Sequence, residues 1–163
     1  ATTGPGASDR GLVVRPIEAR RLKAGTTQTL QNANGSAISN GDWGTVGTDL
    51  DNRTELARSY DFKLDCGFGS SVTANEDIDL YLVPKLNGSD AATIDTANDR
   101  AQPSHYAGTF LTPTTGTASR KLTLEGVDVG PHLYTAYLFN QSGQQVSANW
   151  SLKAYPTLHQ SGA

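Results

Sequence analysis

Acidic side chains, which could bind a metal cation, gather at two places along the chain. The first group lies in the segment TDLDNRTE and consists of Asp49, Asp51, Asn52 and Glu55. A calcium-binding EF-hand loop needs oxygen ligands at positions 1, 3 and 5, glycine at position 6 and glutamate at position 12. Counted from Asp49, the last three of these positions hold Arg53, Thr54 and Tyr60. The EF-hand pattern therefore fails, and a solvated loop is the better interpretation.

The second acidic group is Glu76, Asp77 and Asp79. Asp77 and Asp79 are two residues apart, so in a strand they lie on one face, and a polar outer face explains them better than a shared cation. The three histidines, His105, His132 and His159, show no HxH or HExxH spacing. We therefore expect neither a metal site nor a bound cofactor.

Candidate nucleophiles are equally sparse. Cys66, the single cysteine, is in phase with the apolar residues of an alternating segment, which predicts a buried and unreactive thiol. The chain has no GxSxG elbow and no Walker A or dinucleotide-binding glycine motif. We therefore predict no catalytic residues and a protein that is not an enzyme.

The charge of the chain is unevenly distributed. The net charge is −3, but residues 1–25 contain five basic and two acidic side chains, while residues 26–163 contain eight basic and fourteen acidic ones. The basic residues of the N-terminal segment are Arg10, Arg15, Arg20, Arg21 and Lys23. Because this segment has no aromatic residue, its composition is a weak indication of nucleic-acid binding. Binding to an acidic protein surface, with arginines paired to its carboxylates, is the better interpretation. No apolar run is long enough to span a membrane.

Three aromatic residues are candidates for exposed contacts: Trp43, Tyr81 and Tyr134. Trp43 lies in a loop-like setting, and the two tyrosines fall out of phase with the apolar faces of their predicted strands. By contrast, Trp150 is in phase with its apolar neighbours, which predicts a core position. Exposed aromatic residues are typical of interaction surfaces.

The candidate residues above must be positioned by short segments in which apolar and polar residues alternate, and glycine and proline separate these segments. In 59–68, Tyr60, Phe62 and Leu64 share the apolar face, and in 77–83 the inward residues are Ile78 and Leu80 with Leu82. In 132–139 we expect Leu133, Thr135, Tyr137 and Phe139 to point inward. The other predicted strands are 27–30, 105–111, 120–124 and 146–155, with a weak candidate at 45–50, and one helical turn is expected at 17–23.

About eight antiparallel strands predict an all-β sandwich of two sheets, and an eight-stranded jelly roll is its natural form. An immunoglobulin-like sandwich or a small barrel is the alternative. We divide the chain into a flexible basic N-terminal arm, residues 1–25, and a β-sandwich body, residues 26–163.

Four segments between Ser59 and Tyr155 resemble a known family. They are DLYLVPKLNGSD (79–90), PSHYAGTF (103–110), RKLTLEGVDVGPHLYTAYLFNQSG (120–143) and SANWSLKAYP (147–156). Together they resemble tailed-bacteriophage decoration or cement proteins of the jelly-roll type, although residues 1–58 match no motif of that family. The resemblance implies a structural virion protein that binds the outer surface of the capsid, with the major capsid protein as partner and no catalytic residue.

On this interpretation the basic arm contacts the shell and the bodies associate as dimers or trimers. The protein would be made in the host cytoplasm, as the small first residue after a removed methionine also suggests, and would reside in the virion. The alternative is a ligand-binding β-sandwich, such as a carbohydrate-binding or receptor-contacting phage appendage. In that case Trp43, Tyr81 and Tyr134 would form an aromatic platform.

Overall fold

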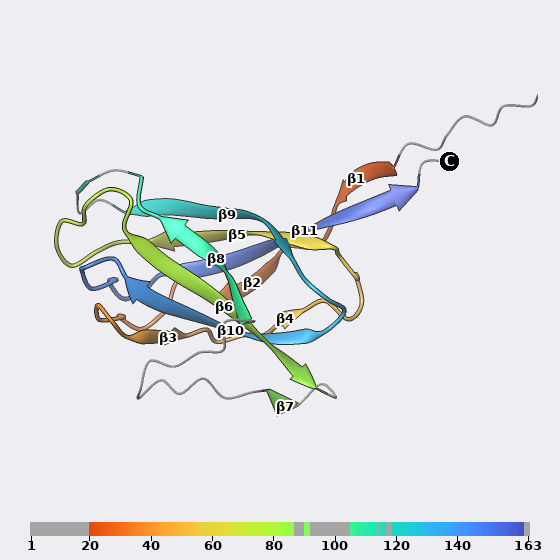
Figure 1. Ribbon diagram of the computed structural model, residues 1–163, viewed down its shortest axis with the longest axis horizontal. Helices are drawn as coiled ribbons and strands as arrows, with labels where there is room; N and C mark the ends of the chain where they lie inside the picture. The colour runs from red at the N-terminus through yellow and green to blue at the C-terminus, as the bar shows by residue number, and fades with distance from the viewer. Residues whose placement is uncertain (1–19, 87–89, 92–104, 114, 117–118, 162–163) are drawn as a thin grey trace, which may run out of the picture.

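The computed structural model describes residues 20–86, 90–91, 105–113, 115–116 and 119–161, with the backbone alone at 20–24, 90–91 and 159–161. Every regular element in these ranges is a strand (Figure 1). The strands are β1 (Arg20–Ala24), β2 (Gln28–Gln31), β3 (Trp43–Thr45), β4 (Leu50–Asp51), β5 (Ser59–Cys66), β6 (Asp77–Leu86), β7 (Asp90–Ala91), β8 (Tyr106–Leu111), β9 (Arg120–Asp128), β10 (Leu133–Gln141) and β11 (Ser151–Ser161).

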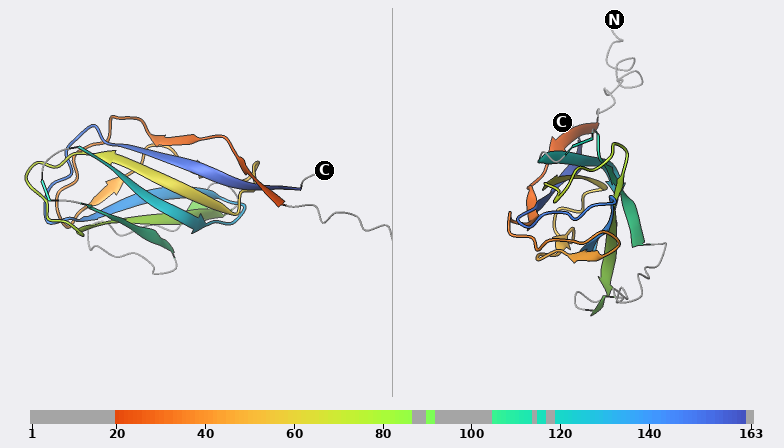
Figure 2. Two further views of the ribbon diagram at one scale, coloured as in Figure 1. Left: turned by 90° about the horizontal axis from the view of Figure 1, so that it is seen from above. Right: turned by 90° about the vertical axis from the view of Figure 1, so that its left-hand side faces the viewer.

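The strands form two antiparallel sheets, which Figure 2 shows as two layers. One sheet has the order β1-β11-β5-β9, with β2 also paired to β11. The other has the order β3-β10-β6-β7, with β4 also paired to β10 and β8 to β6. The predicted all-β sandwich is confirmed.

The strand pairs are nested along the chain. The first strand of the body, β2, pairs with the last, β11; β3 and β4 pair with β10; β5 pairs with β9; and β6 pairs with β8. The chain is thus one long antiparallel hairpin, rolled so that alternate pairs fall in opposite sheets. This pattern is the jelly roll. Residues that are distant in sequence are thereby brought together on each sheet.

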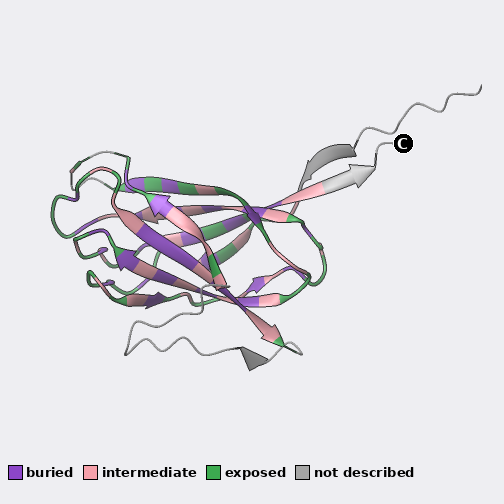
Figure 3. Ribbon diagram, viewed as in Figure 1, coloured by how far each residue is buried: buried purple, intermediate pink, exposed green. Residues whose placement is uncertain are grey.

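The core lies between the two sheets (Figure 3). Because successive side chains of a strand point to opposite faces, every second residue points into this core. In β5, all the residues predicted to point inward are buried, Cys66 among them. In β6, Ile78, Leu80 and Leu82 are buried as predicted. Trp150, just before β11, is the largest fully buried side chain, and its Nε1 donates to the Ser36 carbonyl oxygen at 2.7 Å.

The predicted phase of β10 is wrong. The buried residues are Tyr134, Ala136, Leu138 and Asn140, whereas Leu133, Thr135, Tyr137 and Phe139 lie on the outer face. Asn140 tolerates the core because its Nδ2 donates to the carbonyl oxygens of Ile38 and Gln144, at 2.9 and 2.8 Å. Both faces of this strand are largely apolar, so alternation alone does not identify the inner one.

The N-terminal segment also differs from its prediction. Residues 20–24 form no helical turn; they are strand β1, paired with β11 from Arg20 opposite Ser161 to Ala24 opposite Thr157. Because β5 pairs with β11 only as far as Thr157, the last residues of β11 pair with β1 alone. The two strands project from the body as a ribbon (Figure 1). The basic residues Arg20, Arg21 and Lys23 therefore belong to a sheet, whereas Arg10 and Arg15 lie outside the described residues.

Candidate binding face

Five aromatic rings gather on the outer side of the sheet that contains β10. They come from four adjacent strands: Trp43 from β3, Tyr137 and Phe139 from β10, Tyr81 from β6 and Tyr106 from β8. Strand register explains the meeting, because Phe139 is opposite Trp43, Tyr137 is opposite Tyr81, and Tyr81 is opposite Tyr106. We call this surface the aromatic face.

Trp43 is at the centre of the contacts. Its ring centroid lies 4.6 Å from that of Phe139, 5.0 Å from that of Tyr81 and 6.4 Å from that of Tyr137. The rings of Tyr81 and Tyr106 are 5.6 Å apart, and Tyr106 is the most exposed of the five, at 48%. The Trp43–Tyr81 and Tyr81–Tyr106 pairs meet edge to face, and each pair of this kind contributes about 1 kcal/mol of stability beyond the area that it buries.

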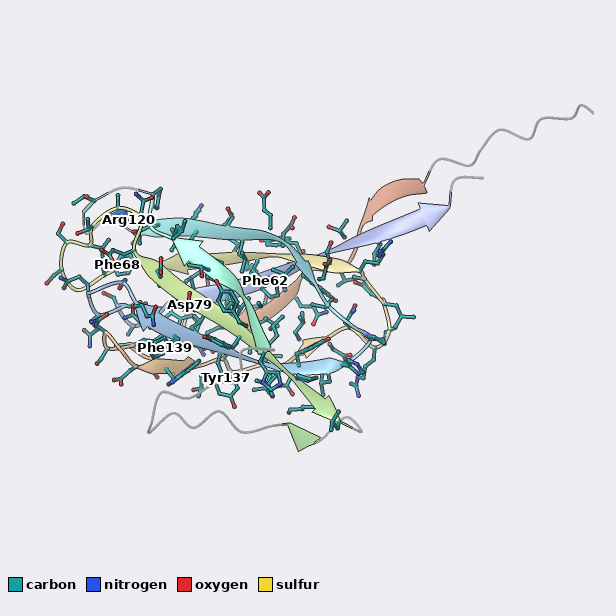
Figure 4. All side chains as sticks on the ribbon, in the orientation of Figure 1. Phe62, Phe68, Asp79, Arg120, Tyr137 and Phe139 are labelled. Atoms are coloured by element: carbon teal, nitrogen blue, oxygen red, sulfur yellow. The ribbon has the colours of Figure 1, made fainter. Side chains whose placement is uncertain are left out.

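Asp79 lies among these rings. It is on the same face of β6 as Tyr81, opposite Phe139 of β10 on one side and Thr109 of β8 on the other (Figure 4). The residue is only 9% exposed, and the Thr109 hydroxyl donates to Asp79 Oδ1 at 2.6 Å. Tyr106 in turn shares a hydrogen bond with Thr109. Burial raises the pKa of Asp79, and the charge of Asp77 adds to this, although the Thr109 hydrogen bond lowers it.

The outer side of the other sheet has a different character. Asp61, Lys63 and Asp65 of β5 alternate with its core residues, and Asp65 is opposite Lys121 of β9 while Lys63 is opposite Lys153 of β11. We call this surface the charged face. A sandwich with one charged outer face and one aromatic outer face has an obvious side for docking, because contiguous apolar surface on a soluble domain marks an interaction site.

Two of the three predicted aromatic contacts lie on the aromatic face. Trp43 and Tyr81 are half-buried and touch each other. The prediction that Tyr134 is exposed is wrong: it points inward and is 8% exposed, and its hydroxyl oxygen accepts a hydrogen bond from the Gly130 amide at 2.7 Å. Tyr134 instead lines a cavity of about 350 Å³ with Leu82 and Val129.

Sequence reasoning missed Tyr106, Tyr137 and Phe139, and it placed Asp79 on an outer strand face without predicting its burial among the rings. Tyr137 and Phe139 were assigned to the core by the wrong phase of β10. For Tyr137 and Phe139 the available signal was that both faces of β10 are rich in apolar residues, which is unusual for a strand whose outer face is exposed to solvent.

The first acidic group is engaged in separate interactions and does not converge on one point. Asp49 pairs with Lys85 at 2.6 Å, and Asp51 pairs with Arg53 at 2.8 Å, which lowers the pKa of Asp51 to about 2. Asn52 is buried, where its Oδ1 accepts hydrogen bonds from the Ala57 amide and the Tyr60 hydroxyl. Within the described residues, no group of three or more histidine, cysteine or acidic side chains could hold a metal ion.

Cys66 is buried, as predicted, with a relative exposure of 3%. Burial raises the pKa of its thiol to about 12, and the neighbouring charge of Asp65 adds to the effect. A thiol with this pKa is protonated near neutral pH, so Cys66 makes a poor nucleophile.

Comparison with known proteins identifies no family for this chain. No family model and no curated protein matches the chain. One solved structure with a similar backbone is a glycoside hydrolase family 43 arabinoxylan arabinofuranohydrolase from Bacillus subtilis, in complex with cellotetraose. The TM-score is 0.39 and the identity 15%, over 88% of this chain, which spans 28% of that protein's length. Among the described residues there is also no helix that could cross a membrane.

Proposed function

We propose that this chain is a structural protein of a phage virion that binds the outer surface of the capsid. The observation that carries the proposal is the contrast between the aromatic face and the charged face. The sequence motifs of β6, β9 and β10, which resemble those of phage decoration proteins, support the same function.

The aromatic face has the composition of a protein-binding surface. Aromatic residues are enriched at the centres of protein interfaces, where a few of them supply most of the binding energy. Here the rings are held in place by one another and by the ladders of β3, β10, β6 and β8, so little side-chain freedom would be lost on docking.

The basic N-terminal segment supplies a second contact. Residues 1–25 carry Arg10, Arg15, Arg20, Arg21 and Lys23, of which the last three lie in β1. These basic side chains would pair with acidic surfaces of neighbouring subunits in the shell. If the copies bind one symmetric shell as dimers or trimers, the binding energy of several modest contacts adds up.

The test is co-sedimentation of the full-length protein with capsids that lack it, using a matched pair of tyrosine variants. Tyr106 is on the aromatic face and 48% exposed, and Tyr155 is on the charged face and 36% exposed. We expect Tyr106→Ser to weaken capsid binding about tenfold or more, as loss of an interface anchor does, and Tyr155→Ser to leave it unchanged. Equal binding by both variants, or no binding by the wild-type protein, would reject the proposal.

A ligand-binding β-sandwich is the second candidate, and the contact between Trp43 and Tyr81 favours it. Stacking on a sugar requires an open ring face, however, and here the Trp43 and Tyr81 planes meet at 65° while Trp43 also packs against Phe139. Titration of a glycan panel, followed by tryptophan fluorescence, tests this candidate. Saturable binding that is lost on Trp43→Ala would support it over capsid binding.

A further inference from the structure

Asp79 is in an unusual position for a carboxylate. It is nine-tenths buried on an outer sheet face, yet only Oδ1 has a hydrogen-bond donor among the described residues, the Thr109 hydroxyl. Burying a charge is costly unless the charge is paired. The charged group close enough to influence it, Asp77 on the same strand, has the same sign. One oxygen of the Asp79 carboxylate therefore remains available to a ligand, and no cation in the described structure pairs with it.

The surroundings of Asp79 suit one kind of cation. Phe139 is its cross-strand neighbour and Tyr81 follows it on the same face. A guanidinium group pairs with a carboxylate through directed hydrogen bonds and also stacks on aromatic rings. An arginine side chain of a docked peptide would thus meet a carboxylate and ring surface together.

The chain itself contains a segment of this chemistry. Residues 1–25 carry a net charge of +3, and two of their arginines, Arg10 and Arg15, precede β1. Arg20, Arg21 and Lys23 are within β1, which pairs with β11, whereas Arg10 and Arg15 come before this strand in the sequence. The remaining chain, residues 26–163, carries −6, which makes a second copy an electrostatically suitable partner.

The position of β1 permits contact with a second copy. The β1–β11 ribbon projects from one end of the body, so β1 lies beyond the sandwich (Figure 1). Ten extended residues span about 33 Å, which lets Arg10 reach a neighbouring body.

We propose that the N-terminal segment of one copy docks beside Tyr81 and Phe139 on the aromatic face of a second copy, with Arg10 or Arg15 paired to Asp79, which leaves Tyr106 to the capsid. The inference rests on the proposed function for its biological setting, a shell on which copies are neighbours. The contact itself is a property of the protein alone, so it is tested without capsids.

The experiment is a double-mutant cycle on self-association of the full-length protein, measured by light scattering over a range of concentrations. The variants are Asp79→Asn, the pair Arg10→Ser with Arg15→Ser, and the combination of all three. Asp79→Asn keeps an oxygen to accept the Thr109 hydrogen bond. The control, Asp65→Asn, removes the same charge from the charged face.

We expect the wild-type protein to self-associate more weakly as salt is added, and Asp79→Asn and the arginine pair each to weaken association about tenfold. The combined variant should be no weaker than either, because the two changes remove one interaction. Asp65→Asn should associate as the wild type does. Tyr81→Leu, which removes a ring and no charge, should also weaken association.

Three results would overturn the inference: a wild-type protein that stays monomeric, unchanged association of Asp79→Asn, or effects of the two changes that add. Capsid binding is scored separately with the Tyr106→Ser and Tyr155→Ser pair. Loss of the self-association coupling with capsid binding intact rejects the inference alone, and the reverse result rejects the proposed function alone.

Discussion

At the residue scale, Asp79 is placed for binding at a cost to stability. Its pKa is raised in the folded protein, chiefly by burial, so the native state holds the proton more tightly than the unfolded chain does. In the pH range between the ordinary carboxyl pKa, about 3.9, and the raised value, stability must fall as pH rises. Above that range the penalty is fully present.

Asp79→Asn should therefore raise the melting temperature at pH 7 while it weakens self-association. The gain over the wild type should grow as pH rises from about 4 and then level off, because the amide carries no charge to bury. Thermal unfolding at a series of pH values measures it, with Asp65→Asn on the charged face as the control that lacks the gain. A variant less stable than the wild type at pH 7 would show that the Asp79 carboxylate stabilises the fold.

Asn52 plays the opposite role, because its buried hydrogen bonds stabilise the fold. It is 1% exposed, and its Nδ2 donates to the carbonyl oxygens of Ala57 and Gly130 while its Oδ1 accepts from Tyr60. Asn52→Ala removes these hydrogen bonds, leaves the buried Ala57 carbonyl and amide without their Asn52 partner, and should cost about 2–4 kcal/mol in the free energy of unfolding.

Urea denaturation of Asn52→Ala measures that loss, and Arg53→Ala is a neighbouring control. The Arg53–Asp51 pair is exposed, so its removal should cost less than about 1 kcal/mol. Comparable losses in the two variants would mean that the buried network contributes little.

At the scale of elements, the sequence predicts phase only where one face of a strand is polar. In β5, Asp61, Lys63 and Asp65 mark the outer face, and the inward residues follow directly. In β10 both faces are largely apolar, so the sequence alone could not assign Tyr137 to the outside. The aromatic face depends further on register between β3, β10, β6 and β8, which are far apart in the chain. The sequence predicts two of its residues, Trp43 and Tyr81, as candidates for exposed contacts, but it does not predict that they touch each other.

Strand β1 should be dispensable for folding. The body is closed without it, since β2 also pairs with β11 and Gly25 donates to the Pro156 carbonyl oxygen at 3.3 Å. Deletion of residues 1–24 should leave the far-ultraviolet circular dichroism of the sandwich and its cooperative unfolding intact, with a loss of about 1 kcal/mol for the ladder bonds removed. An aggregated or non-cooperative truncated protein would show instead that β1 is part of the body's folding unit.

At the scale of the whole molecule, the jelly roll presents two dissimilar outer faces and a projecting ribbon that carries basic residues. A compact body with a docking face and a reaching segment is well suited to binding a repeating protein surface, where contacts add over many copies. The fold by itself does not specify this function, because the same architecture serves many others. The proposal therefore depends on where the protein resides.

Quantitative mass spectrometry of purified virions from the source of this sequence tests that claim most directly. We expect the chain to be present in the particle at a copy number close to a multiple of 60, as icosahedral occupancy of a capsid surface requires. Its absence from intact virions, or its presence in only a few copies as in a tail appendage, would contradict a role on the capsid surface.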